Sequence, residues 1–416
     1  MINAPHAPTR RELLLASGVL FAWAHLPRAA RAEGRDPRLL VVVLRGALDG
    51  LAAVAPVGDP DWIGLRGDNA LTLDSEPKAL PLDGFFALNP AMPNLHRMYQ
   101  AGTATVVHAV ASPYRERSHF DGQDVLESGF VKPGAADSGW LNRALASLQP
   151  AARVGSKDAF AVGPVTPLVV RGNAPVLSWT PPKLPPAGDD TVMRVLDLYR
   201  HTDPTLARAL EERVDLAAIA RDGGLDMQPK KSGPMPQVRG AAIRNYFSES
   251  AGAAAKFMAR ADGPRVGALA FDGWDTHAAE GAANGRLALL LGALDGALGS
   301  IESGIGDAWK ETAVVVITEF GRTARINGTE GTDHGTATVA LLAGGALKGG
   351  RVIADWPGLS AAKLYQDRDL KPTTDLRAVL KGLLRDHLRV DERALASAVF
   401  PGSERVKAAN GLVLAS

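Results

Sequence analysis

Nine polar side chains of the types that bind metals or attack esters stand next to apolar runs of the chain. They are Asp49, Ser118, His119, Asp275, His277, Glu319, Arg322, Asp333 and His334. Four are carboxylates and three are imidazoles, which are the usual protein ligands of zinc, manganese or iron where thiols are absent. The chain has no cysteine. The residue types therefore predict a divalent metal site built from nitrogen and oxygen.

A metal held there would polarise a bound oxyanion or acidify a water molecule. Arg322 could pair with a phosphate or sulfate oxygen through its two-pronged guanidinium group. Together these groups suit an anionic ester or a glycan as the small-molecule partner.

Each cluster also has a structural interpretation that needs no chemistry. The alternatives are a helix cap at Ser118-x-x-Asp121, a turn at Asp49-Gly50, a hydrogen-bonded loop pair at Asp275 and His277, and an ion pair between Glu319 and Arg322. The concurrence of all the clusters favours a site over any one of these alternatives.

The elements that must position these residues are five apolar, β-rich runs. They cover residues 39–44, 103–110, 266–271, 313–318 and 337–342. Helical apolar spacing at 287–301 and 375–388 lies between or after them, and strands that alternate with helices indicate a doubly wound, mainly parallel α/β sheet. Ligands of such sheets bind beyond the carboxyl ends of the strands. We therefore expect the clusters to share one edge of the sheet.

Residues 36–400 are predicted to form a single α/β domain. Proline-rich loop segments precede helical patterns at 191–220 and 240–260, which indicates a mainly helical insertion over 180–262. Residues 401–416 are expected to form a C-terminal tail.

The first 32 residues have the pattern of an export signal. Arg10 and Arg11 precede an apolar run that is too short to cross a bilayer, and Ala30-Arg31-Ala32 suits signal peptidase. We expect export of the folded chain by the twin-arginine machinery, cleavage of residues 1–32, and a periplasmic or secreted mature protein without stable membrane insertion. An uncleaved N-terminal anchor or a disordered tail is the alternative.

The overall charge argues against nucleic acid as a partner. Lys and Arg number 46 against 45 Asp and Glu, so the formal net charge is +1, whereas nucleic-acid binding needs a basic face. Hydrophobic residues make up 46% of the chain, which excludes a disordered or collagen-like protein.

Six phrases of the chain together resemble the bacterial domain-of-unknown-function family 1501, which is similar to the alkaline phosphatase/sulfatase superfamily. The phrases are L-V-V-V-L-R-G-A-L-D-G-L at 40–51, R-S-H-F-D-G-Q at 117–123, G-W-L-N-R at 139–143, G-W-D-T-H at 273–277, T-E-F-G-R-T at 318–323 and G-T-D-H-G at 331–335.

The resemblance implies an alkaline phosphatase/sulfatase-like α/β fold with a divalent metal: zinc, manganese, calcium or magnesium. It implies metal ligands at Asp49, Asp275, His277, Glu319, Asp333 and His334, and Ser118 as the catalytic nucleophile. We further expect His119 and Arg322 to contact the oxyanion or the leaving group.

We therefore expect an exported metal-dependent hydrolase of phosphate or sulfate esters. The first alternative is a non-catalytic periplasmic binding or assembly protein that retains the fold. A second alternative is an enzyme of another class that uses the same metal.

Overall fold

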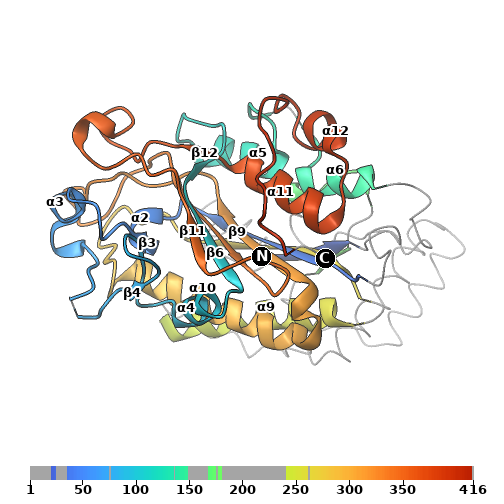
Figure 1. The fold of residues 1–416 in the computed structure, drawn as a ribbon, viewed down its shortest axis with the longest axis horizontal. Coiled ribbons are helices and arrows are strands. Elements are labelled where there is room, and N and C mark those ends of the chain that lie inside the picture. Colours follow the sequence, from blue (N-terminus) through green and yellow to red (C-terminus); the bar gives the residue numbers. More distant parts are fainter. Residues whose placement is uncertain are drawn as a thin grey trace, which may run out of the picture.

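The computed structural model describes residues 20–24, 35–74, 76–134, 136–148, 167–174, 177–179, 240–260 and 263–414. A nine-stranded, mainly parallel sheet runs through the centre of these residues (Figure 1). Its order is β11 (Arg351–Ile353), β6 (Ala104–Ala111), β10 (Thr338–Ala343), β9 (Thr312–Thr318), β2 (Arg38–Arg45), β8 (Val266–Asp272), β1 (Leu20–Ala24) and β7 (Leu177–Trp179), and β12 (Thr374–Asp375) pairs with β6.

The five strands predicted from apolar runs are present as β2, β6, β8, β9 and β10. β2 lies at the centre and is parallel to both β8 and β9. β10 runs antiparallel to its neighbours β6 and β9. The N-terminal end of β10 therefore lies at the edge where its neighbours have their carboxyl ends.

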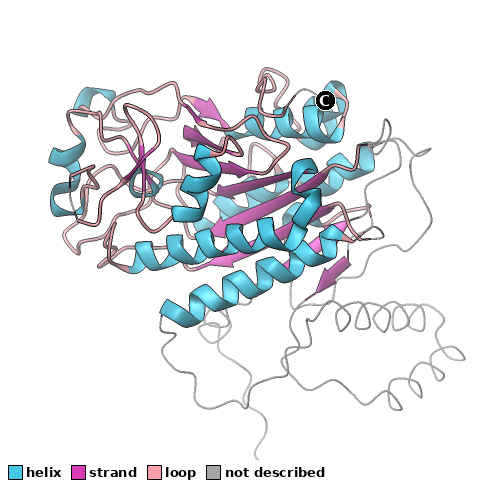
Figure 2. Ribbon diagram, turned by 60° about the horizontal axis from the view of Figure 1, so that its bottom comes forward, coloured by secondary structure: helices cyan, strands magenta, loops and turns pink. Residues whose placement is uncertain are grey.

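Helices cover both faces of the sheet, which explains why β2 is apolar without alternation. Leu40, Val42 and Leu44 belong to the core on the side of α4 (Pro93–Gln100), α9 (Gly240–Ala259) and α10 (Arg286–Ile305). The opposite-facing residues Leu39, Val41 and Val43 belong to the core with α6 (Trp140–Ser147) and α11 (Leu376–Leu388). The two layers are visible on either side of the sheet in Figures 1 and 2.

The remaining elements are short. They are α2 (Gly50–Ala53), α3 (Trp62–Arg66), α5 (His119–Ser128), α12 (Glu392–Ala394), the turns η2 (Gly67–Asn69), η4 (Leu168–Val170), η5 (Gly306–Glu311), η6 (Ala361–Lys363) and η7 (Leu395–Val399), and a separate three-stranded sheet of β3 (Val54–Ala55), β5 (Ala87–Leu88) and β4 (Leu80–Pro81).

The C-terminal part of the predicted insertion belongs to the helical layer on the sheet. Phe247, Ala251 and Met258 of α9 are buried in the same core as α10. The predicted helix over 191–220 and most of the insertion lie outside the described residues.

One helical stretch in the described part, Arg286–Glu311, is long and apolar enough to cross a membrane by length and composition. More than half of its most apolar window (56%) is buried, and the face of α10 that holds Leu287, Leu291 and Leu294 packs into the core. Burial by the protein itself accounts for the apolar character of this stretch.

Only residues 20–24 of the predicted export signal are described. They form β1, which pairs antiparallel with β8 and with β7. Cleavage after Ala32 would remove this strand and leave the outer edge of β8 without it.

Candidate metal centre

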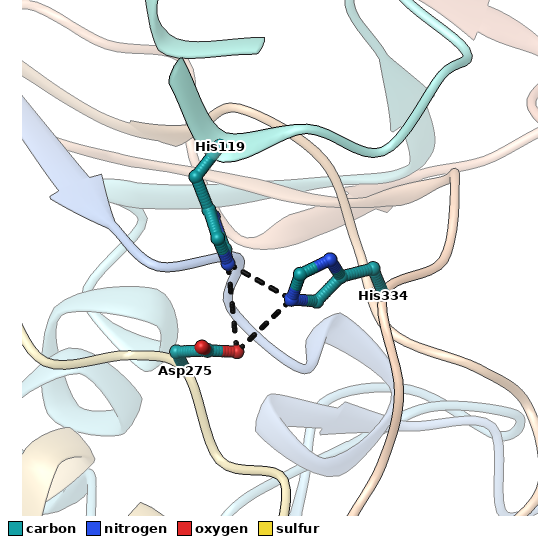
Figure 3. A group of neighbouring side chains, drawn as sticks. All are labelled: His119, Asp275 and His334. Carbon is teal, nitrogen blue, oxygen red and sulfur yellow. Dashed lines mark hydrogen bonds and ion pairs between the residues drawn. The ribbon is translucent and has the colours of Figure 1, made fainter. Parts of the chain in front are cut away.

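Four side chains from three loops point their ligand atoms at one another. Nε2 of His334 lies 2.9 Å from Nε2 of His119, 3.0 Å from Nε2 of His277 and 3.2 Å from Oδ1 of Asp275. The same Oδ1 lies 2.9 Å from Nε2 of His277 and 3.5 Å from Nε2 of His119. Figure 3 shows His119, Asp275 and His334, which form a possible three-residue metal site. His277 adds a fourth ligand atom to this group.

The other ring nitrogen of each histidine faces an acceptor. Nδ1 of His119 lies 2.9 Å from Oε1 of Glu319. Nδ1 of His334 lies 2.9 Å from the carbonyl oxygen of Arg117, and Nδ1 of His277 lies 3.3 Å from Oδ1 of Asp333. A carbonyl or carboxylate oxygen can only accept, so Nδ1 carries the proton in each neutral ring. Three Nε2 lone pairs and one carboxylate oxygen are then left facing one another.

The electrostatics of the cluster favour positive charge. Burial lowers the pKa of His119, but hydrogen bonds to Asp275 and Glu319 outweigh it and raise that pKa to about 9. Burial raises the pKa of Asp275, but its contacts with His119 and His334 and the hydrogen bond from Arg322 outweigh it and hold that pKa well below its usual range. The cluster thus attracts a proton or a cation into the space between its lone pairs.

Topology brings these loops to one edge of the sheet. His119 begins α5 after β6, and Asp275 and His277 follow the carboxyl end of β8. His334 precedes β10, whose reversed direction puts its N-terminal end at the same edge. An isolated antiparallel bridge between Arg322 and His334 holds the loop after β9 beside the loop before β10.

Close backbone approaches set the position of the ligand loops. Gly46 follows β2 with φ +119°, and a Cβ there would lie 2.6 Å from the backbone nitrogen of Asp275. Only glycine allows both this backbone conformation and this contact. A Cβ at Gly331 would lie 2.3 Å from the backbone of His277. The glycines of two predicted motifs thus let the loops reach each other.

Two of the predicted ligands lie behind the histidines. Glu319 is fully buried, and its Oε1 also accepts hydrogen bonds from the backbone of Gly46 (2.8 Å) and from Gln123 (3.2 Å). Asp333 contacts Nδ1 of His277. Both acids therefore orient histidine rings from the side away from the cluster, as carboxylates behind zinc-binding histidines do.

Asp49 is not brought to the cluster. Its side chain caps α2 by accepting from the backbone nitrogens of Leu51 (3.0 Å) and Ala52 (3.2 Å), and it forms a buried ion pair with Arg66. Arg66 also donates to the carbonyl of Ala324 (2.8 Å). The carboxylate of Asp49 is fully used in holding this part of the fold together.

Arg322 holds a ligand of the cluster. Its NH1 donates to Oδ1 of Asp275 at 2.7 Å, and its Nε and NH2 donate to the hydroxyl and the carbonyl of Thr332 at 3.1 and 2.5 Å. The side chain is buried. We therefore assign Arg322 to positioning Asp275, since all three nitrogens are bonded within the protein.

Ser118 stands at the N-cap of α5, directly before His119, but its side chain makes no capping hydrogen bond. The helix begins where the sequence predicts, but the capping alternative for the hydroxyl is wrong. The backbone nitrogen of Ser118 donates to the hydroxyl of Tyr114 at 3.1 Å. The Ser118 hydroxyl is thus left for another role at the helix N-terminus.

One side of the cluster is open to solvent. The side chains of Asp275 and His277 are 40% and 45% exposed, whereas Glu319 and Arg322 beneath them are buried. A small molecule can therefore approach the cluster from outside. Trp140 and Trp274, which the motifs contain, are fully buried in the core and line no open surface.

The sequence patterns assign no role to Arg117, although it begins the phrase at 117–123, and they do not mark Arg368 or Asp369. Arg117 has φ +60°, a strained value for a non-glycine residue, and its carbonyl accepts from His334. Arg368 donates to the carbonyl of His334 at 2.6 Å. No periodicity marks these residues, because they lie in irregular loops.

Residues 36–399 match the model of a family described as "Protein of unknown function (DUF1501)". The chain belongs to this family. The matched residues include all four members of the cluster, so the candidate centre lies within the region that defines the family. No curated protein and no solved structure matches the chain.

Proposed function

We propose that this DUF1501 protein is a metal-dependent hydrolase of phosphate or sulfate esters, with one metal held by His119, Asp275, His277 and His334. The observation that carries the proposal is the convergence of three Nε2 atoms and one Oδ1 atom, while Nδ1 of each ring faces a separate acceptor. Lone pairs at such short separations repel one another unless a cation or a proton lies between them.

The separations suit a small divalent metal. Zinc with bonds of about 2.0–2.1 Å in tetrahedral geometry sets its ligand atoms roughly 3.3 Å apart. The contacts that His334 and Asp275 make with each other and with His119 and His277 are 2.9–3.5 Å long. Three imidazoles favour zinc or a similar transition metal, whereas calcium and magnesium prefer oxygen ligands. Zinc therefore fits the donor set best among the metals that the resemblance implies.

The carboxylates behind the rings support the same proposal. Histidines that bind metals commonly donate Nδ1–H to a carboxylate or a carbonyl, which fixes the ring and increases the basicity of Nε2. All three histidines have such a partner. Arg322 in turn fixes Asp275.

Ser118 is the proposed nucleophile. A bound divalent metal would polarise the ester and lower the pKa of a nearby hydroxyl group. The Ser118 oxygen would form the bond to phosphorus or sulfur while the alcohol of the ester departs, and water would then release the acid. The N-terminus of α5 (His119–Ser128) stabilises the developing negative charge.

The predicted export signal supports a location for this activity. We propose that the folded, metal-loaded chain crosses the membrane by the twin-arginine route and acts in the periplasm or outside the cell. Loading before export fits a chain whose metal ligands come from loops far apart in the sequence.

The metal content of purified variants tests the proposal. We expect about one transition metal per wild-type chain and less than a tenth of that in His277→Ala and in His334→Ala. His96→Ala is the matched control, because His96 is a surface histidine whose Nε2 contacts the carbonyl of Pro81. A wild-type chain that takes up no metal from solutions of zinc, manganese, magnesium or calcium would overturn the proposal.

Hydrolysis is measured next with nitrophenyl phosphate and nitrophenyl sulfate. Ser118→Ala should keep its metal and lose at least about 100-fold in kcat, because the attacking oxygen is gone. A wild-type chain that holds metal and hydrolyses neither class of ester, nor any of a panel of alkyl and sugar esters, would favour a binding or assembly protein that retains the fold.

A further inference from the structure

A second guanidinium group, that of Arg368, lies beside the candidate metal centre. Its NH2 donates to the backbone carbonyl of His334 at 2.6 Å, so the group stands next to a ligand loop. The side chain is 39% exposed. It also lies close enough to Asp333 for its charge to contribute to lowering the pKa of that carboxyl group, after the larger effect of a hydrogen bond from Asn327.

Asp369, the next residue, is a buried anchor for this region. Its Oδ2 accepts hydrogen bonds from Nε (3.0 Å) and NH2 (2.7 Å) of Arg117 and from the hydroxyl of Thr336 (2.7 Å). Its Oδ1 is buried without a hydrogen-bond partner, and NH1 of Arg368 is 3.7 Å away. One carboxylate thus stands between two guanidinium groups, which leaves a net charge of +1.

The guanidinium groups near the cluster differ in what they can still bind. Arg322 is buried with all three nitrogens bonded inside the protein. Arg117 is bound to Asp369 and, through NH2, to Gln366 at 2.6 Å. Arg368 is the more exposed group and has a single hydrogen bond among the described residues, through NH2. Its Nε has no hydrogen-bond acceptor among those residues, and its NH1 has only the 3.7 Å ion pair with Asp369.

We propose that Arg368 binds the oxyanion of the substrate, and that the Arg117–Asp369 pair positions it. A guanidinium group donates two parallel hydrogen bonds to the tetrahedral oxyanion of a phosphate or sulfate ester. The ester oxygens would then lie between Arg368 and the metal centre. This inference rests on the proposed function and names its recognition residue, a role that the sequence suggests for Arg322.

Binding of inorganic phosphate and of inorganic sulfate to the zinc-loaded full chain tests the inference, by calorimetric titration of each anion separately. For whichever anion the wild type binds more tightly, Arg368→Gln should lower the affinity at least about tenfold, which is 1.4 kcal/mol. The zinc content should stay at the wild-type value. Arg368→Lys should recover part of the affinity, because it restores the charge but not the two-pronged geometry.

The matched control is Arg325→Gln. Arg325 is an exposed arginine three residues after Arg322, so the variant loses the same charge near the site. Solvent screens such a charge, and we expect less than a twofold change in anion affinity.

The inference would be overturned if the zinc-loaded wild-type chain bound neither anion. It would also be overturned if the Arg368→Gln variant bound zinc and both anions as tightly as the wild type does. A chain that takes up no zinc contradicts the proposed function instead, and titration of that metal-free chain with phosphate still tests Arg368. If the metal-free wild type and the metal-free Arg368→Gln variant bound phosphate equally well, the inference would be overturned as well.

Discussion

At the scale of single residues, the centre depends on which nitrogen of each imidazole carries the proton. Glu319, Asp333 and the carbonyl of Arg117 accept hydrogen bonds from Nδ1–H of the three rings and so direct the Nε2 lone pairs inward. Glu319 is fully buried, so solvent screens its charge little and the charge acts strongly on His119. A ligand and its partner are thus one functional unit.

Glu319→Gln should lower the affinity for the metal about 10–100-fold. Glutamine keeps an acceptor for the backbone of Gly46 and for Nδ1 of His119, so the fold should survive, but the negative charge behind the ring is lost. Competition with a chromophoric chelator measures the affinity. Glu302→Gln is the control, because Glu302 pairs with Arg97 on the surface of α10. Equal metal affinities in the two variants would refute the role of Glu319.

At the scale of elements, strand ends and tight turns carry the centre. The turn after β2 passes so close to the loop after β8 that Gly46 lies against the backbone of Trp274 and Asp275. The cap of α2 depends on a carboxylate that also neutralises a buried arginine. These contacts connect the stability of the sheet edge to the position of the ligands.

Gly46→Ala should lower the free energy of unfolding by about 1–3 kcal/mol and weaken metal binding at least tenfold. The new Cβ would lie 2.6 Å from the nitrogen of Asp275, so the ligand loop has to move. Urea denaturation and metal titration measure the two effects. Gly67→Ala is the control, because Gly67 also has positive φ (+50°) but has no atom within 4 Å of the new Cβ. It should cost about 1 kcal/mol without changing metal affinity.

Asp49→Asn separates a structural acid from a ligand. The substitution leaves the Arg66 charge buried without its partner, so the free energy of unfolding should fall by about 3–5 kcal/mol. The folded protein should keep its full metal content. Asp391→Asn is the control, because Asp391 caps the exposed start of α12. It should lower the free energy of unfolding by less than about 1 kcal/mol. Loss of metal at unchanged stability would show instead that Asp49 is a ligand.

At the scale of the whole molecule, two histidines buried in the fold make stability depend on pH. His108 donates from Nε2 to the carbonyl of Val54 at 3.0 Å, and His387 donates to the carbonyl of Arg38 at 2.8 Å. Burial lowers the pKa of each to about 4, against about 6.5 in an unfolded chain. Both rings are therefore neutral in the native protein.

The unfolded chain binds protons on these histidines at a higher pH than the native chain does. Above about pH 6.5 both histidines are neutral in the folded and the unfolded chain, so they do not lower the free energy of unfolding. As the pH falls from about 6.5 to about 4, only the unfolded chain binds the protons, and the free energy of unfolding decreases. At about pH 4, each of the two rings should have lowered the free energy of unfolding by about 3 kcal/mol. His387→Gln should therefore lose about 3 kcal/mol less than the wild type between pH 7 and pH 4, by urea denaturation. His96→Gln is the surface control, and parallel pH profiles of the wild type and His387→Gln would refute the assignment.

The sequence by itself determined the central strands and the edge at which the polar clusters meet. Continuous apolar runs such as β2 and β9 specify strands buried on both faces, because they leave no face for water. Once strands of one sheet are specified, the loops at their carboxyl ends share an edge. Residue types and their order thus locate the loops after β6, β8 and β9, whereas His334 reaches the same edge because β10 runs antiparallel to its neighbours.

Only the tertiary structure decided which of the predicted acids meet the histidines. Asp275 reaches the Nε2 atoms, Glu319 and Asp333 lie behind the rings, and Asp49 pairs with Arg66. The two sides of an imidazole ring lie only a few ångströms apart, and spacing along the chain does not specify which side a carboxylate reaches. That choice follows from long-range contacts such as Gly46 against Asp275 and Arg368 against His334, which exist only after the loops pack together.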